Sequence, residues 1–455
     1  MTQRHTLPTS TSLTRYQLSF SFHRSTTKYH LSYQLTSTLP VNTLIMKHAK
    51  LYGLLVATAG AAVLQSQNMP NYRGIKFGPD RKLSISVFSD LHFGEPESQR
   101  GRPNADLKTV GVMSSVLDNE RPDFVVLNGD LVSCEWVAPE DVNALIDQVV
   151  APLVDRSLPF GATFGNHDAS KTCSTVSMSK HMWNDVKGKN GHKLSFTTQS
   201  VSGDYDQVGW SNYFVPVYSS TNGEELKMLL WFFDSKGGRK YQPTGDDVQL
   251  PNWVDQKVMA TSYTVVNWFR STNTAFLRQY GRAIPSMAFV HIPIHATYTF
   301  QGADHSDTTN PGLNEEVIGQ QGDNCDSSGN NCGYNGADIP FMEALVENKG
   351  LMAVFSGHDH KVDWCMKWSK NLPDTSPSNG NGLNICFNRH SGYGGYSDYT
   401  RGARQIVVGE DSLGQNLVDT WIRLENGQIS GRVSLNSTFG TDKYPVVSKV
   451  KSSGF

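Results

Sequence analysis

The sequence predicts an α/β fold in which two stacked, mixed β-sheets are flanked by helices, a four-layer αββα sandwich. Two observations predict it: short apolar runs rich in β-branched and aromatic residues recur along the chain, and segments with helical patterning separate them. The runs lie at residues 83–88, 124–127, 287–290 and 351–355, with a weaker one at 159–164. Each run is bounded by polar or turn residues, which is typical of a buried strand.

The remaining elements fill the other layers. We expect helices where apolar residues recur at helical spacing, at residues 104–119, 139–150, 262–280 and 339–348. Further strands are expected to complete a second sheet with a hairpin end across Asn426-Gly427. These strands are residues 213–218, 227–233, 420–424 and 429–435.

Side chains of the types that bind metals follow the first five strands. They lie in the segments Asp90-Leu91-His92, Gly129-Asp130, Gly165-Asn166-His167-Asp168, His291 and Gly357-His358-Asp359-His360. In an open α/β sheet, ligands bind beyond the carboxyl ends of the strands, so we expect these segments to converge. Imidazole and carboxylate groups without cysteine suit iron, zinc or manganese, and Asp130, held by a tight glycine turn, is a candidate bridge between two ions.

This ordered set of motifs resembles the calcineurin-like metallophosphoesterase superfamily. The resemblance implies that Asp90, His92 and His360 hold one metal ion, that Asn166, His291 and His358 hold another, and that Asp130 bridges them. It also implies hydrolysis of phosphate monoesters through attack by a hydroxide bound to the two metals, with a phosphorylated substrate as the partner. Phosphodiester or nucleotide hydrolysis at the same site is an alternative, and a catalytically silent binding or regulatory protein is another. The intact ligand set favours an enzyme.

His167 is expected to act on the substrate and not as a ligand. A phosphoester needs a proton donor for its leaving oxygen, and a histidine whose pKa is raised by the neighbouring carboxylate of Asp168 suits that role. Stabilising the charge of the transition state is the alternative role.

Further motifs resemble the purple-acid-phosphatase-like proteins of fungi and plants, of the short type without a fibronectin-like domain. They are residues 288–293, 357–365, 384–387 and 391–396, and the likeness covers residues 82–410. True purple acid phosphatases carry a tyrosine ligand three residues after the bridging aspartate, where this chain has Ser133. Tyrosinate ligation is therefore not expected, and the metal stays open among iron, zinc and manganese.

The substrate contacts are predicted less directly. Arg389 in the turn Asn388-Arg389-His390-Ser391 can offer a bidentate cation to a phosphate oxygen, with His390 beside it, or can be an ordinary surface arginine. Of the two nearby histidines, His291 is assigned as the metal ligand because it directly ends its apolar run. His295 is then a candidate outer-shell or substrate contact. Residues 296–338 form a long polar connection, and loops of that length are often functional, so we expect it to wall the substrate site.

Composition sets the outer limits. The chain has 455 residues, 38% of them hydrophobic, and a net charge of −2. This length supports a large α/β domain at residues 82–440, or two domains. The charge gives no basic footprint for nucleic-acid binding, and no run of 18 apolar residues predicts a transmembrane segment.

The N-terminal part differs in composition. Residues 1–45 contain no Asp or Glu and many Ser and Thr, which predicts a disordered leader or a misassigned start. From Met46 a short basic stretch precedes an apolar run, so residues 46–66 are predicted to be a signal peptide of a secreted protein, cleaved near residues 62–67. A mitochondrial or vacuolar destination and an ordinary buried helix are the alternatives.

The cysteines agree with export. The six cysteines avoid the proposed ligand positions and can pair as Cys325 with Cys332, Cys365 with Cys386, and Cys134 with Cys173. In a cytosolic protein six free thiols would be expected instead. The sequence Asn436-Ser437-Thr438 is a glycosylation sequon.

Overall fold

The computed structural model describes residues 75–100, 103–242, 247–254, 257–259, 262–325 and 332–452, together with two strands nearer the N-terminus. The chain divides into two units, Met1–Asn68 and Met69–Phe455. In the first, β1 (Tyr16–Arg24) pairs antiparallel with β2 (Thr27–Leu35). Apolar and polar residues alternate in both, which is the period of a β-strand. The predicted signal peptide at residues 46–66 lies outside the described residues.

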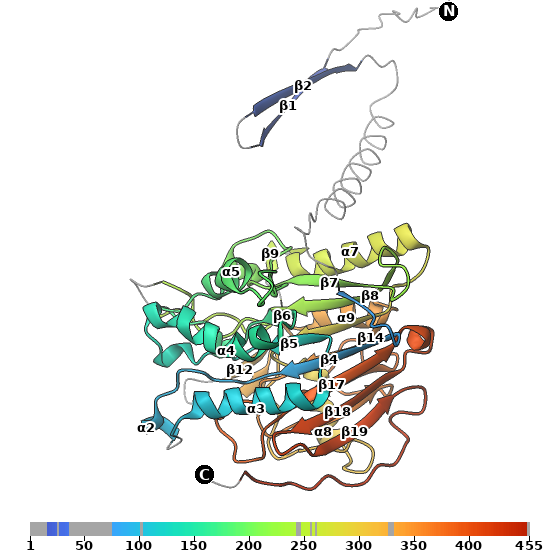
Figure 1. Ribbon diagram of the computed structural model, residues 1–455. Coiled ribbons are helices and arrows are strands. Elements are labelled where there is room, and N and C mark those ends of the chain that lie inside the picture. Colours follow the sequence, from blue (N-terminus) through green and yellow to red (C-terminus); the bar gives the residue numbers. More distant parts are fainter. Residues whose placement is uncertain are drawn as a thin grey trace, which may run out of the picture. The chain divides into compact units, whose positions relative to one another are not determined.

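The second unit contains two mixed sheets (Figure 1). One has seven strands in the order β15-β16-β14-β11-β8-β7-β3, and the other has six in the order β19-β18-β17-β4-β5-β6. The seven-stranded sheet is built from β3 (Ile75–Lys76), β7 (Tyr213–Tyr218), β8 (Leu226–Phe233), β11 (Ser286–Val290), β14 (Leu351–Ser356), β15 (Cys365–Trp368) and β16 (Leu383–Phe387). The six-stranded sheet is built from β4 (Lys82–Phe88), β5 (Phe124–Asn128), β6 (Phe160–Thr163), β17 (Gly402–Gly409), β18 (Val418–Leu424) and β19 (Ile429–Leu435).

The strands that precede the metal-ligand motifs are split between the two sheets. β4, β5 and β6 run parallel in one sheet, and β11 and β14 run parallel in the other. The prediction that residues 213–218, 227–233, 420–424 and 429–435 share one second sheet was wrong, because β7 and β8 belong to the larger sheet and β18 and β19 to the smaller. Buried strands of different sheets have similar apolar sequences, so the sequence pattern does not predict which sheet a strand joins.

Helices cover the outer face of each sheet, as predicted. On the six-stranded sheet lie α3 (Ala105–Glu120), α4 (Val142–Arg156) and α5 (Thr175–Asp185), which share a buried cluster with β5 and β6. On the seven-stranded sheet lie α7 (Thr264–Tyr280) and α9 (Ile339–Glu347), which contact each other. The described residues also form α2 (Glu97–Arg100), α6 (Tyr205–Val208), α8 (His295–Ala303), β9 (Lys257–Met259), β10 (Ser262–Tyr263), β12 (Asp323–Cys325) and β13 (Cys332–Tyr334).

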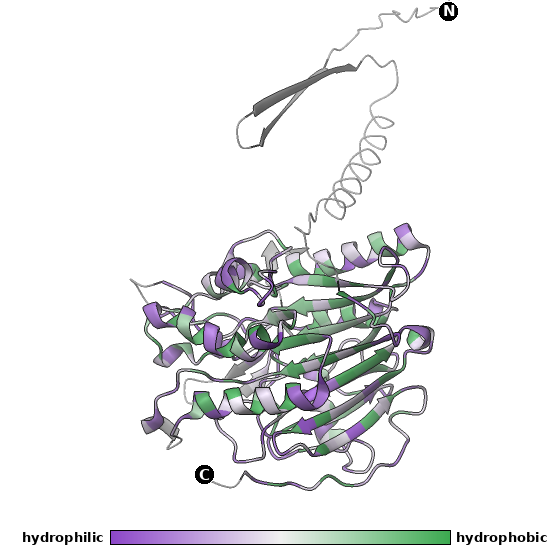
Figure 2. Ribbon diagram, viewed as in Figure 1, coloured by the Kyte–Doolittle hydropathy of each residue, from purple (hydrophilic) through white to green (hydrophobic). Residues whose placement is uncertain are grey.

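Strand β8 shows why the layers hold together. Phe232 on one face stacks on Phe289 and Tyr213 within the core between the sheets, while Trp231 and Phe233 on the other face contact Phe269 of α7. Each buried aromatic side chain contributes about 1.5–3 kcal/mol of apolar burial. Figure 2 shows the same division, with hydrophobic strands inside and polar residues along the outer helices. The layers therefore fix the strand ends that carry the motifs.

Covalent links and membrane features complete the fold. The pairings Cys134–Cys173 and Cys365–Cys386 are confirmed as disulfides. The side chains of Cys325 and Cys332 lie outside the described residues, so their pairing stays a prediction. Within the described ranges, no helix is both long and apolar enough to cross a membrane.

Candidate metal centre

The predicted ligands sit where the backbone turns sharply at strand ends. Asp90, His92, Asp130 and His358 all have positive φ, between 51° and 75°. This left-handed region is unfavourable for residues other than Gly, Asn and Asp, so His92 and His358 are the strained positions. Such strain concentrates at functional sites. The tight turns make consecutive motif residues point toward the same edge of the two sheets.

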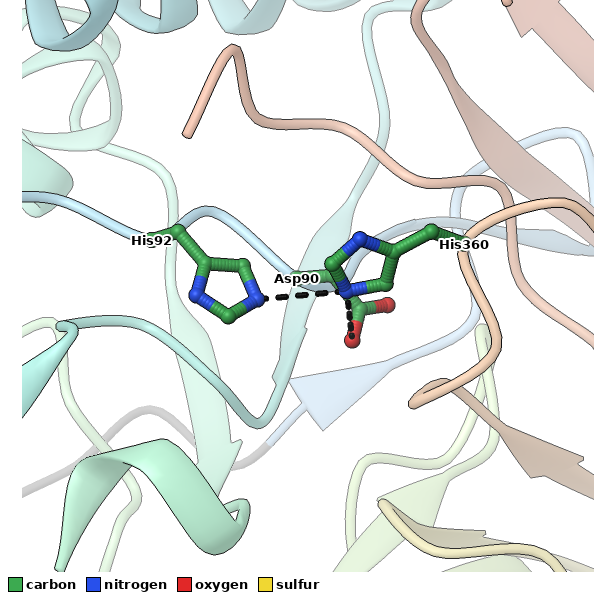
Figure 3. A group of neighbouring side chains, drawn as sticks. All are labelled: Asp90, His92 and His360. Atoms are coloured by element: carbon green, nitrogen blue, oxygen red, sulfur yellow. Dashed lines mark hydrogen bonds and ion pairs between the residues drawn. The ribbon is translucent and has the colours of Figure 1, made fainter. Parts of the chain in front are cut away.

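Asp90, His92 and His360 form the first group (Figure 3). All three are buried, and one ligand atom from each lies within 4.8 Å of the others. The Nε2 atoms of His92 and His360 are 3.2 Å apart, and Nε2 of His360 lies 3.7 Å from Oδ1 of Asp90. Two imidazoles and a carboxylate that converge in this way can hold a transition-metal ion.

Asp130, His291 and His358 form the second group, in which one ligand atom from each again lies within 4.8 Å of the others. Oδ2 of Asp130 lies 3.1 Å from Nε2 of His291 and 3.7 Å from Nε2 of His92, a member of the first group. One carboxylate oxygen therefore faces both groups, which is the position that a bridge requires.

Asn166 tests whether the second group fits a metal ion. Its Oδ1 atom is buried and has no hydrogen-bond partner among the described residues. A buried polar atom without a partner is costly, and a bound cation would satisfy it. Close packing agrees, because a Cβ added at Gly165 would lie 2.2 Å from Oδ1 of Asp130 and 2.7 Å from the His291 ring. The residues present thus fit a compact metal centre.

Partners behind the imidazoles orient three of them. Nδ1 of His291 donates to the Asn128 carbonyl at 2.9 Å, and Nδ1 of His360 donates to the Tyr396 carbonyl at 2.9 Å. Both rings therefore turn Nε2 toward the centre. Nδ1 of His92 lies 2.8 Å from Oγ of Ser133, whose hydroxyl donates to Glu95. Ser133 thus sits behind His92, on the side of the ring away from the centre.

The protonation preferences differ among the imidazoles and carboxylates of the two groups. Burial and the nearby His291 lower the pKa of His358 to about 3, and burial also lowers the pKa of His360, so both imidazoles are neutral. Burial raises the pKa of Asp90 to about 6, and the adjacent Asp130 adds to the rise. Burial disfavours a charged His291, but the carboxylate of Asp130 outweighs it and raises the pKa of His291 to about 10. Buried groups of this kind are characteristic of functional sites.

His167 lies beside the second group, and its charged partner differs from the predicted one. Its backbone N–H donates to Asp130 at 2.8 Å, and its Nδ1 lies 2.6 Å from Oε1 of Glu135. Burial opposes protonation of His167, but Asp130 and Glu135 outweigh it and raise its pKa to about 9.

The predicted role of Asp168 was wrong. Its carboxylate accepts the backbone N–H groups of Leu131 and Val132 at 2.8 and 2.9 Å and that of Gly165 at 2.8 Å. Asp168 therefore fixes the turns that carry Asp130 and Asn166. Glu135 was not among the predicted site residues. The signal that could have identified it is its position as an acidic residue five positions after Asp130.

A cavity of about 210 Å³ opens above both groups. Its lining includes His167 and most of the candidate ligands, Val317 and Gly319 from the connection that was expected to wall the site, and Tyr396. Glu95, Asp359 and Gly395 also line it and were not among the predicted site residues. Val317 and Gly319 belong to the long connection 296–338, which also contains most of α8. Tyr396 stacks on His360 with ring centroids 4.0 Å apart.

The three predicted substrate contacts do not line this cavity. Arg389 is buried, its Nη1 donates to Asp363 at 2.6 Å, and its Nε and Nη2 donate to the Thr400 carbonyl. The prediction that Arg389 binds phosphate was wrong, because its guanidinium is already committed. His390 is buried with its ring centroid 4.0 Å from that of His360. His295 is buried, faces Gln320 through Nδ1 and stacks on Tyr334.

Comparison with protein families and curated relatives adds to this geometry. The family model described as calcineurin-like phosphoesterase matches residues 83–362. The chain is 25% identical over 368 residues to "Probable inactive purple acid phosphatase 14" of Arabidopsis thaliana, covering 77% of this chain and 80% of that protein. It is 24% identical over 350 residues to "Phosphatase DCR2" of Saccharomyces cerevisiae, covering 75% of this chain and 54% of the yeast protein.

Solved structures are more distant. A dimetal phosphatase from Danio rerio aligns with 78% of this chain and 98% of its own, at 10% identity and a TM-score of 0.44. A purple acid phosphatase, PPD1, from yellow lupin seeds aligns with 78% of this chain and 53% of its own, at 11% identity and a TM-score of 0.41.

Proposed function

Since the chain belongs to the calcineurin-like phosphoesterase family, we propose that it is a metal-dependent hydrolase that cleaves phosphate monoesters in the cavity above Asp130. The observation that carries this proposal is the position of one carboxylate, Asp130, within 3.7 Å of imidazoles from both buried groups. A single oxygen so placed suits two ions in one site, which is the arrangement used for in-line displacement at phosphorus.

The proposed ligands follow from the two groups. Asp90, His92 and His360 would hold one ion, Asn166, His291 and His358 the other, with Asp130 shared. When bound, the two metal ions would supply a hydroxide near neutral pH and neutralise charge on the phosphoryl oxygens. The donor set of nitrogen and oxygen atoms suits iron, zinc or manganese, and Ser133 offers no phenolate to single out iron.

His167 is the proposed proton donor. Its Nδ1 is engaged by Glu135, so Nε2 is the nitrogen left to serve the cavity that His167 lines. A protonated imidazole there would give its proton to the leaving oxygen, which makes the alcohol a better leaving group. Glu135 keeps the ring oriented, and Asp168 keeps the Asp130 turn in place.

A catalytically silent member is the competing function, because the name of the Arabidopsis relative contains the word inactive. The proposed ligands and His167 are all present in this chain, and six of the seven ligands fall into the two buried groups. This supports turnover over binding alone. A silent protein has no need for a proton donor beside the metal groups.

Metal content and turnover, measured together, test the proposal. The full chain, reconstituted separately with iron, zinc and manganese, should hold about two metal equivalents per chain by elemental analysis. It should hydrolyse an aryl phosphate monoester faster than the matched diaryl ester and faster than a nucleoside triphosphate. Chelator-treated protein is the control and should lose activity. Metal-replete protein that cleaves none of these substrates would establish the silent alternative.

Export is a separate proposal. We propose that residues 46–66 direct the chain to the secretory pathway and that residues 82–440 form the catalytic domain. Two disulfides support an oxidising destination. Mass spectrometry of the protein from an expressing eukaryotic cell should find a mature N-terminus near residues 62–67 and a glycan on Asn436. An intact N-terminus in the cytosol would refute this.

A further inference from the structure

One wall of the cavity is made by residues 314–319, here named the wall segment. It belongs to the long connection after His291, and two of its residues, Val317 and Gly319, line the cavity. Val317 is 74% exposed, while the next residue, Ile318, is 2% exposed. The segment therefore anchors one apolar side chain in the protein and presents the other to the cavity.

Gln301 of α8 holds the wall segment in place. Its Nε2 donates to Oδ1 of Asn314 at 2.6 Å and to the Glu316 carbonyl at 2.7 Å, and its Oε1 accepts the Ile318 N–H at 3.1 Å. These bonds flank Val317 on both sides. The position of the Val317 side chain is thus set by hydrogen bonds to its neighbours in the chain.

The wall segment also lies close to the second group of candidate ligands. The Gly319 N–H donates to Oδ1 of Asp359 at 2.8 Å. A Cβ added at Gly319 would lie 2.9 Å from Nε2 of His358, closer than real Cβ contacts allow. The wall therefore leaves little room above the second group, in agreement with a cavity of about 210 Å³, below the roughly 300–1,000 Å³ of sites for larger ligands.

The ionisable side chains that line the cavity are mostly acidic or neutral apart from the histidines. On the side of Glu95, the Gly395 N–H donates to its carboxylate at 2.8 Å, and Tyr396 adds an aromatic face. Apart from the candidate ligands and His167, the ionisable lining groups are Glu95, Asp359 and Tyr396, and the described lining contains no Lys or Arg. The lining itself thus offers no lysine or arginine to a second anionic group on the substrate, and Lys361, whose Nζ lies 5.6 Å from the centre of the Tyr396 ring, is not part of it.

We propose that the wall segment makes the cavity selective for phosphate esters whose leaving group is small and carries no further negative charge, with Val317 as the residue that contacts it. This inference rests on the proposed phosphoester chemistry. A second anion at the mouth would approach the Glu95 carboxylate, while the cationic His167 serves the leaving oxygen and the lining holds no Lys or Arg. Repulsion between such like charges across a partly hydrated gap corresponds to about a five- to tenfold loss of affinity. Polyphosphorylated substrates are disfavoured on the same ground.

Non-hydrolysable ligands test this without relying on turnover. The probes are propylphosphonate and 3-phosphonopropionate, which match in length and differ by one carboxylate at the far end. Titration calorimetry on the metal-loaded full chain should show propylphosphonate binding about five- to tenfold more tightly. In Val317→Lys the preference should fall at least threefold, because the ammonium would pair with the added carboxylate.

Leu277→Lys is the matched control. Leu277 is 48% exposed on α7, which leads into the start of β11, whereas His291 follows the other end of β11. This variant adds the same charge at the opposite edge of the sheet and should leave the preference unchanged. A Val317→Lys protein that behaves like Leu277→Lys, or wild-type protein that binds both probes equally, overturns the inference and leaves the proposed function standing.

The size limit has its own measurement. Val317→Ala should improve binding of 2-naphthylphosphonate relative to propylphosphonate by about threefold or more, since it removes bulk at the mouth. An unchanged ratio would refute the role of Val317 in size selection. If metal-loaded wild-type protein binds no phosphonate at all, the proposed function fails and this inference fails with it.

Discussion

The floor and the mouth of the cavity are built by different means. The floor is formed by His92, Asp130, His358 and His360, and Asp90 and His291 complete its two metal groups outside the cavity lining. These residues are almost entirely buried and follow the ends of strands in the two sheets. The mouth, represented by Glu95, Val317 and Tyr396, belongs to connecting segments held by individual hydrogen bonds. Under the proposed function, the layered core would determine the reaction class, and the loops attached to it would determine which ester enters.

Asp130→Asn should break the floor most severely. The change keeps the shape of the side chain but removes the charge that faces both groups. We expect turnover to fall on the order of 10⁴-fold, because the metal ions supply several kcal/mol of stabilisation that a neutral bridge would not secure. Elemental analysis should find fewer than two metal equivalents. A variant that keeps both metals and normal turnover would exclude Asp130 as the bridge.

His167→Ala should leave the floor intact and remove the proton donor above it. We expect a loss in kcat of about 10²- to 10³-fold for substrates with poor leaving groups, with an unchanged metal content. The loss should be smaller for aryl esters with acidic leaving groups, which need less protonation. Loss of metal in this variant would show that His167 is itself a ligand.

Ser133→Ala tests whether the support behind a ligand matters as much as the ligand. Without the hydroxyl at 2.8 Å, Nδ1 of His92 loses this hydrogen bond, which helps to orient the ring. We expect the affinity for one of the two metal ions to fall about tenfold or more, measured by competition with a chromophoric chelator. Ser356→Ala is the matched control, because Ser356 is buried at the end of β14 and its Oγ has no hydrogen-bond partner among the described residues. Equal effects in both variants would contradict a role of Ser133 in orientation.

The floor could be predicted from sequence for a physical reason. Its residues lie within about five positions after an apolar run. Strands β4, β5, β11 and β14 form where those runs predict them. The chemistry of the side chains then restricts what the strand ends can do. Sequence also predicted the helices, because their apolar spacing records the face that packs on a sheet, as in α3.

Contacts between distant segments were not predictable in the same way. Arg389 looks like a surface cation in its glycine-rich turn, yet Asp363 and Thr400 bury it. Asp168 follows His167 directly but turns away from it to bind the Leu131 and Val132 backbone. The assignment of strands to sheets and the contact between Glu135 and His167 leave no periodic signal in the sequence. Both depend on contacts between segments that are distant in the chain.

Glu135→Gln is expected to have the smallest effect, and it probes the boundary between floor and mouth. The Glu135 and His167 side chains are 39% and 38% exposed, so solvent screens their interaction and we expect kcat/KM at neutral pH to fall less than about tenfold. The pH profile should be more informative. Glu135 helps to raise the pKa of His167, so the variant should have a lower His167 pKa.

A proton donor is active below its pKa and loses activity as the pH rises through it, so the basic limb of kcat/KM should move to lower pH in Glu135→Gln. Glu140→Gln removes the same charge from an exposed residue five positions further along the chain and should leave the profile in place. A basic limb that does not move, with metal content unchanged, would mean that the limb reports a group other than His167. The mouth would then influence binding alone, and proton transfer would have to be assigned to the floor.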